Sequence, residues 1–199
     1  MSNYEYIIAG LPVLQKDAAA SSSNPNADEI IDEIRSLLSD RDAARLDFLL
    51  RGFDSENLNA DFYREALGSR SEFIRKYFAY DLLVRNTRTA WLNKSLGRAE
   101  GTDIVTVEQD TDISEEVPAI NEVLSQKDIL ARERELDSLM WNRIEEINVI
   151  KVFDLDVILG FVACLKIVDR WIKLDPQTGR ELFRKLVEEI RSSRTEQKQ

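Results

Sequence analysis

Apolar residues recur along most of the chain at the three- and four-residue spacing of an amphipathic α-helix. In the first such stretch, Asn26 is placed to cap a helix and Glu29, three residues later, to reach back to it. Ser39 or Asp40 is expected to end that helix and to begin the next, which Gly52 stops. Further helical stretches cover residues 59–67, 71–96, 128–150, 154–174 and 178–190. The pattern predicts an all-α fold, a bundle of about eight helices joined by short turns.

Two segments leave the type of element open. Residues 4–14 alternate aromatic and aliphatic side chains, so they are expected to form either a short strand or the first turn of a buried helix, ended by Pro12. Residues 103–108, with the sequence DIVTVE, alternate as a single strand would. The Ser-, Asn- and Pro-containing stretch 16–27 is expected to be a surface loop.

The stretch 71–96 predicts the longest helix, of about seven turns, with Gly97 as its C-cap. Its first half is apolar on most sides and is therefore expected to be enclosed by neighbours. Beyond Val84 the apolar stripe narrows, and polar and basic side chains face outward. The enclosing set is Phe73, Ile74, Tyr77, Phe78, Leu82, Leu83 and Val84.

Two later helices differ in how much of their surface is apolar. The helix at 128–150 is expected to bury one stripe, whereas the helix at 154–174 is apolar enough for the centre of a bundle. The first stripe consists of Ile129, Leu136, Leu139, Met140, Ile144, Ile147 and Ile150, and the second set of Ile158, Phe161, Val162, Leu165, Val168 and Trp171.

Charge is spread unevenly along the chain. The formal net charge of −10 disfavours binding to a phosphate backbone, so no nucleic-acid partner is expected. Residues 99–126 hold eight acidic residues and no basic one, whereas residues 64–98 hold eight basic and three acidic residues. This is either an ordinary surface with a solvated acidic connector, or a chain that presents one sign of charge to each of two partners.

Little in the sequence indicates catalytic chemistry. The chain has no histidine, one cysteine (Cys164) and no glycine-rich phosphate motif, so neither a metal nor a cofactor is expected. Asp154 and Asp156 stand two residues apart, which is typical of helix capping. The stretch EQDTDISEE, residues 108–116, resembles a calcium loop only crudely because it lacks the loop glycine. An enzyme built on these carboxylates and a metal stays open as an alternative.

The expected compartment is the cytoplasm. A lone thiol suits a reducing compartment, and no signal peptide is recognised at the start of the chain. The longest uninterrupted apolar run, residues 157–165, is shorter than the ~20 residues of a membrane span, so no direct membrane insertion is expected. The chain is predicted to be one domain, 1–199, with two helical sub-units, 1–100 and 120–195, joined by the acidic segment 99–126.

Four basic residues of the longest helix and its end are the candidate partner-binding residues: Arg85, Arg88, Lys94 and Arg98. Their spacings of three, six and four place them on roughly one side of the helix. Such a face is solvated, forms internal ion pairs, or docks an acidic element of another protein, and the residues alone leave these alternatives open.

Three stretches add a resemblance. YEYIIAGLPVL (4–14), DLLVRNTRTAWLNKSLGR (81–98) and LDPQTGRELFRKLVEEIR (174–191) resemble a bacterial family related to V-type ATPases. Its members look like compact relatives of the C-type protein of the central stalk, whose eukaryotic counterpart is the d-type protein. The resemblance runs from Tyr4 to about Arg191. It implies an all-helical, funnel-like socket, although ordinary C-type stalk proteins are longer and contain three similar helical units where this chain holds at most two.

The resemblance also implies a role. Such a stalk protein sits on the cytoplasmic face of the membrane rotor ring, receives the foot of the central shaft, and passes torque between ATP hydrolysis and ion transport without catalysing a reaction. On this hypothesis Arg85, Arg88, Lys94 and Arg98 contact other V-type ATPase components. The alternative is a free-standing helical adaptor for protein–protein interaction.

Overall fold

The computed structural model describes residues 3–16, 26–108 and 112–174, and within these ranges the chain forms eight α-helices, two short 3-10 helices and no strand. The all-α prediction is therefore confirmed. The helix predicted at 178–190 lies outside the described residues. The α-helices are α1 (Tyr4–Gly10), α2 (Ala27–Leu37), α3 (Asp40–Arg51), α4 (Ala60–Leu67), α5 (Glu72–Leu96), α6 (Val117–Leu124), α7 (Ile129–Asn148) and α8 (Leu155–Lys173), and the 3-10 helices are Ser55–Asn57 and Ser114–Glu116.

Most helices begin at a side-chain cap, as the sequence predicts. The Asn26 side chain accepts a hydrogen bond from the backbone N–H of Asp28, and its amide donates to Glu29 Oε1 at 3.0 Å. Ser39 caps α3, and Gly97 ends α5 in the left-handed conformation with φ 63°. Each side-chain cap at a helix start satisfies a backbone N–H group that the first turn leaves unpaired, and is worth ~1 kcal/mol. The other side-chain caps are Asn59, Ser71, Asp128 and Asp154.

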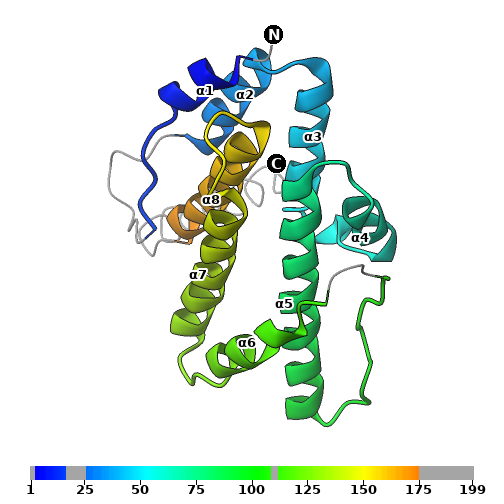
Figure 1. Cartoon of the computed structure of the whole chain (residues 1–199). Helices are drawn as coiled ribbons and strands as arrows, with labels where there is room; N and C mark the ends of the chain where they lie inside the picture. The colour runs from blue at the N-terminus through cyan, green and yellow to red at the C-terminus, as the bar shows by residue number, and fades with distance from the viewer. Residues whose placement is uncertain (1–2, 17–25, 109–111, 175–199) are drawn as a thin grey trace, which may run out of the picture.

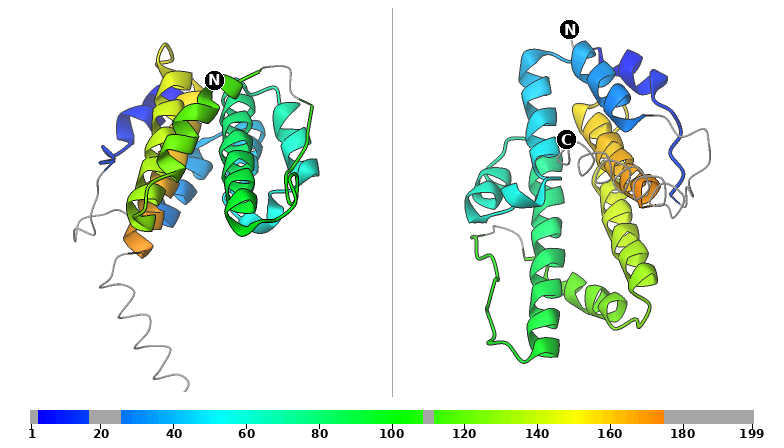
Figure 2. Two further views of the ribbon diagram at one scale, coloured as in Figure 1. Left: turned by 90° about the horizontal axis from the view of Figure 1, so that it is seen from below. Right: turned by 180° about the vertical axis from the view of Figure 1, so that it is seen from behind.

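Helices α5 and α7 run side by side in opposite directions, and α6 crosses between them at one end of the molecule (Figure 1). Helix α8 returns beside α7, while α1, α2 and α3 gather at the opposite end (Figures 1 and 2). Helix α8 packs against α1, α2, α3, α5 and α7, so it holds the centre of the bundle. This is the position that its apolar sequence predicts.

One apolar core joins the helices of both halves of the chain, and it includes Cys164. The first half of α5 is buried as predicted, with Phe73, Phe78 and Leu82 nearly inaccessible to solvent. A smaller cluster fastens α6 to the second half of α5, where Trp91 packs against it. Its buried members are Ile120, Val123, Leu124 and Leu136.

The strand expectation for residues 103–108 is wrong, because no other strand lies beside this segment in the described chain to complete a hydrogen-bonded ladder. Side chains of α5 take that place. The Asn86 amide donates to the carbonyl O of Val105 at 2.8 Å and accepts from its N–H at 3.0 Å. Asn93 donates to the carbonyl O of Thr102 at 2.7 Å. The segment is therefore an extended strap held on the polar side of α5.

The stripe predicted for α7 is correct in its middle and wrong at its ends. Leu136, Met140 and Ile144 are buried. Ile129 and Ile150 are 69% and 86% exposed, because one is the first residue of α7 and the other lies beyond its last residue. Both therefore project past the neighbouring helices.

Candidate functional site

The four predicted partner-binding residues fall into two pairs. Arg85 and Arg88 have contacts inside the protein, whereas Lys94 and Arg98 are exposed. Arg88 is turned toward α7, where its Nη2 lies 2.7 Å from Glu133 Oε1 and its Nη1 makes a second, longer contact with Oε2. This two-pronged ion pair ties α5 to α7. Arg88 therefore has an internal role, and a direct contact with a partner stays a prediction.

Arg85 is half-buried beside a pair of hydrogen-bonded side chains. The Tyr63 hydroxyl donates to Asp81 Oδ2 at 2.6 Å, which links α4 to α5. Burial raises the pKa of the Asp81 carboxyl, and the Tyr63 hydrogen bond and the Arg85 charge offset part of that rise. Arg85 thus stabilises a carboxylate between two helices, and a role in partner binding stays a prediction.

Lys94 and Arg98 remain exposed on the surface. Lys94 borders a hollow of about 630 Å³ whose other lining residues include Trp91, Ile104 and Val117. Arg98 Nη1 lies 3.8 Å from Asp103 Oδ2, a distant contact that leaves the guanidinium accessible. Lys94 lies in the last turn of α5 and Arg98 directly after its C-cap Gly97, so both cations are accessible at this end of the helix.

Exposed aliphatic residues lie at the same end of the molecule, on the last turns of α5 beside this pair and on the first turn of α7. The end of α5 and the start of α7 both lie there (Figure 1). We call this set the lower-end surface: Leu92, Leu96, Ile129 and Leu130, with Lys94 and Arg98. Aliphatic side chains beside exposed cations are typical of a surface that binds an acidic and partly apolar partner.

A second exposed apolar group lies at the other end of α7. The loop 149–153, which we call the upper-end loop, places Val149, Ile150, Val152 and Phe153 in solvent. Sequence reasoning missed this group, because it assigned Ile150 to the buried stripe. One sequence signal could have revealed it: four of the five residues 149–153 are apolar, and this run directly precedes the helix cap Asp154, where a loop is expected.

The upper-end loop is anchored by its one charged residue. The Lys151 side chain is only 13% exposed, and its Nζ lies 2.9 Å from Glu72 Oε2 and also contacts Asp156 Oδ2. The Asn148 amide donates to the carbonyl O of Asp156 at 3.0 Å, which closes the loop from below. The apolar side chains are therefore displayed on a fixed backbone, which limits the entropy lost when a partner binds.

The anchor predicts an acid-sensitive contribution to stability. Hydrogen bonds from Lys76 and then from Lys151 hold the pKa of Glu72 at about 2, below the 4.5 of a free side chain. Its contribution is complete above pH 4.5 and is lost as the pH falls toward 2, because the folded state must then take up a proton on a paired carboxylate. We expect Glu72→Gln to lose less stability than the parent chain between about pH 5 and 2, measured by urea unfolding. Glu56→Gln, an exposed control, should follow the parent curve, and an identical curve for Glu72→Gln would contradict this prediction.

The two carboxylates considered for a metal have structural roles. Asp154 caps α8, and Asp156 accepts a hydrogen bond from the Ser71 hydroxyl at 3.1 Å in addition to its Lys151 contact. In the described ranges, no group of three or more Asp, Glu or Cys side chains is arranged to hold a metal ion. No helix in the same ranges has the length and apolar character needed to cross a bilayer.

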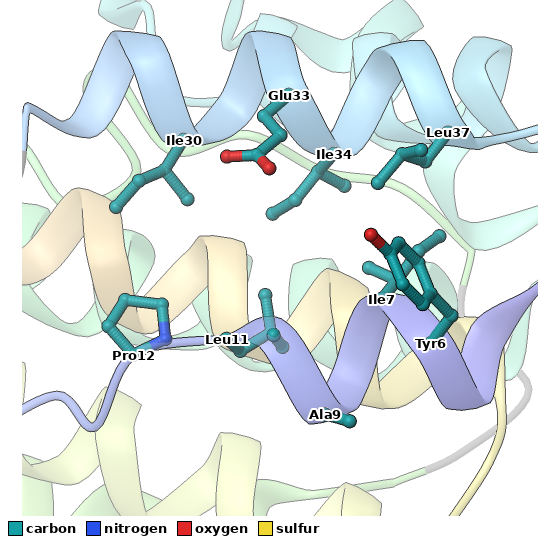
Figure 3. Close-up of a pocket in the computed structure, with 10 residues that line it drawn as sticks. Tyr6, Ile7, Ala9, Leu11, Pro12, Ile30, Glu33, Ile34 and Leu37 are labelled. Atoms are coloured by element: carbon teal, nitrogen blue, oxygen red, sulfur yellow. The ribbon is translucent and has the colours of Figure 1, made fainter.

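A third surface feature is an apolar groove of about 300 Å³ between α1 and α2. Ile30 and Ile34 of α2 face Leu11 and Pro12 across it, and Glu33 is its single carboxylate (Figure 3). The groove is formed by α1, α2 and the segment after α1, which lie at the upper end of the molecule.

The described chain is thus all-helical, with exposed apolar groups at both ends of α7. Its sequence matches the profile of the family described as "Protein of unknown function (DUF2764)" over residues 55–194, and the chain belongs to that family. No curated protein and no solved structure matches the chain.

Proposed function

We propose that this protein is a non-catalytic central-stalk component of a V-type ATPase, of the C type, that couples the membrane rotor ring to the central shaft. The observation that carries this proposal is the placement of exposed apolar residues at both ends of α7. Ile129 and Leu130 are 69% and 59% exposed at its start, and Val149 and Ile150 are 78% and 86% exposed just after its end. A helix of 20 residues separates them by about 30 Å.

Two such surfaces, about 30 Å apart on one helix, suit a protein that contacts two partners at once. A single-partner adaptor needs only one of them. The resemblance to the C-type stalk protein supplies the identity of the partners: the shaft and the rotor ring. The proposed partner surfaces would be the lower-end surface and the upper-end loop.

A coupling element must also resist deformation when one partner turns against the other. Ion pairs between helices stiffen the connection between the two ends: Arg88 with Glu133 links α5 to α7, and Arg170 with Asp137 links α8 to α7. The tightly packed core between α5, α7 and α8 supports them, because close-packed interiors are hard to compress.

Double substitutions at each end test the proposal. We expect Ile129→Ser/Leu130→Ser and Val149→Ser/Ile150→Ser each to weaken binding to a different V-type component, by about 30-fold, as loss of interface anchors does. Lys94→Glu/Arg98→Glu should weaken only the contact at the lower end, and most strongly at low salt. The measurement is a pull-down and titration with purified shaft proteins and rotor ring.

Charge reversal at Arg85 or Arg88 is a poorer test, since it also breaks internal contacts.

Val13→Ser is the matched control, because Val13 is at least as exposed but lies on the segment after α1. All the variants should unfold at the parent's urea concentration, since exposed substitutions change stability by only about 0.5 kcal/mol. Parent protein that binds neither the shaft nor the ring would overturn the proposal and favour a free-standing adaptor. A gene that lies among V-type ATPase genes would support it.

A further inference from the structure

The groove between α1 and α2 presents apolar side chains to solvent at the upper end of the molecule (Figure 3). Ile30 and Pro12 lie at one end of it, and Leu37 and Tyr6 at the other. Tyr6 is 65% exposed and Leu37 is 37% exposed. Ile30 and Leu37 are about 11 Å apart along α2, so the groove matches the length of two helical turns.

The elements that form the groove are acidic. Residues 3–14 and 26–34 hold five acidic residues and no basic one. Glu33 lines the groove, and no cation of the described chain pairs with its carboxylate. Arg35, the first basic residue of α2, pairs with two aspartates instead. An occupant that suits the groove therefore combines an apolar stripe with positive charge along one edge.

The C-terminal sequence has this combination at residues 178–191, which lie outside the described residues. As a helix, their apolar side chains form a stripe about 12 Å long and about 140° wide. Arg180, Arg184 and Arg191 then fall within about 40° of one another, along one border of that stripe. The stretch 17–25, also outside the described residues, has no apolar residue larger than alanine except one proline, so it lacks such a stripe. The stripe consists of Leu182, Phe183, Leu186, Val187 and Ile190.

The described chain ends close to one end of the groove. Helix α8 packs against α1 and α2. A hydrogen bond to Asp169 raises the pKa of Lys173, the last residue of α8, and the charge of Asp28 in the first turn of α2 adds to that rise. Ile30 lies half a turn beyond Asp28. Residues 174–177 extend by up to about 14 Å, which is enough to reach from Lys173 to the groove.

We infer that residues 178–191 bind as a helix in the α1–α2 groove of the same chain. The apolar stripe covers Tyr6, Ile30 and Leu37, and the arginine border lies along Glu33. A groove of about 300 Å³ is small for a separate protein, because stable interfaces are much more extensive. A segment on a short tether has an effective concentration in the millimolar range, so a small contact is sufficient for it. The contact fastens α1 to α2 and does not depend on the proposed coupling role.

Nuclear Overhauser spectroscopy of the full chain, with labelled Phe and Ile, tests the contact directly. We expect cross-peaks between the Phe183 ring and the methyl groups of Ile30 or Ile34. The methyl group of Ile129, which is exposed at the lower end, should show none. A Phe183 ring without a cross-peak to any residue of the groove would overturn the inference.

Limited digestion of the full chain with trypsin measures how firmly the segment is held. We expect cleavage after Arg184 to be at least about tenfold slower than cleavage after Arg194, because a docked helix must open before it is cut. Tyr6→Ser/Leu37→Ser and Phe183→Ser/Leu186→Ser should each speed cleavage after Arg184 by about tenfold, since each removes one side of the apolar contact.

Val152→Ser is the control, because Val152 is as exposed as Tyr6 but lies in the upper-end loop. It should leave cleavage after Arg184 unchanged. Glu33→Gln alone should speed this cleavage about two- to fivefold at low salt, and it keeps the test decisive if a double variant does not fold. Protection that persists in the groove variants, or that falls when the protein is diluted, would overturn the inference, because the segment would then bind elsewhere or in a second copy.

Discussion

Replacing Phe78 by alanine is expected to lower the free energy of unfolding by about 3–5 kcal/mol. The ring is 1% exposed, and three other rings surround it: Phe62 at 4.9 Å, Tyr77 at 5.1 Å and Phe48 at 6.1 Å between centroids, all edge-to-face. Its edge also lies against the backbone of Gly52, where a Cβ would meet ring atoms at 2.3 and 2.4 Å. The substitution would therefore leave a cavity where α3, α4 and α5 meet.

Urea unfolding followed by circular dichroism measures this effect. Phe78→Leu, which retains most of the volume, should cost much less than the alanine variant. Phe153→Ala removes the same side chain from the exposed upper-end loop and should change stability by only about 0.5 kcal/mol. A loss below about 1 kcal/mol for Phe78→Ala would mean that the three helices close over the gap, and that they are not held as rigidly as a coupling role requires.

The helix boundaries could be predicted because caps act locally. Asn26, Ser39 and Asp154 each bond to a backbone group two or three residues away, so the sequence contains both partners of the interaction. The buried half of α5 was also predictable, because a helix that is apolar on most sides has only one stable environment.

The fate of the basic residues could not be predicted in the same way. Arg88 meets Glu133 across 45 positions of sequence, and Arg85 lies beside Tyr63 and Asp81, which approach each other only through the packing of α4 on α5. Spacing along one helix shows which side a cation occupies, but not what another helix brings to it. Internal ion pairs and a docking face were therefore both consistent with the sequence.

The strap at 103–108 and the ends of α7 show a related limit. Alternation in DIVTVE describes a segment with two different sides, and amide side chains of α5 satisfy its backbone as a second strand would. Periodicity also assigns Ile129 and Ile150 to the apolar stripe, but it does not tell where the neighbouring helices stop. Those two positions are among the exposed groups on which the proposed function depends.

Lys151→Met is expected to lower the free energy of unfolding by about 3–5 kcal/mol, because it leaves the Asp156 carboxylate buried without a counter-charge. Burial opposes the charge of Lys151, but hydrogen bonds to Asp156 and Glu72 outweigh that effect and raise its pKa. Asp156 is 8% exposed, so water cannot replace the lost ammonium. Methionine keeps most of the volume of the stem, which makes the lost charge the main cause. Thermal and urea unfolding at neutral pH measure it.

The double variant Lys151→Met/Asp156→Asn separates the electrostatic cause from a packing cause. A neutral amide at position 156 still accepts from the Ser71 hydroxyl and carries no uncompensated charge, so the double variant should regain most of the lost stability. The single variant should also lose part of the acid sensitivity that Glu72 confers, since one of its two lysine partners is gone. Equal destabilisation in the single and double variants would mean that packing of the lysine stem, and not its charge, anchors the upper-end loop.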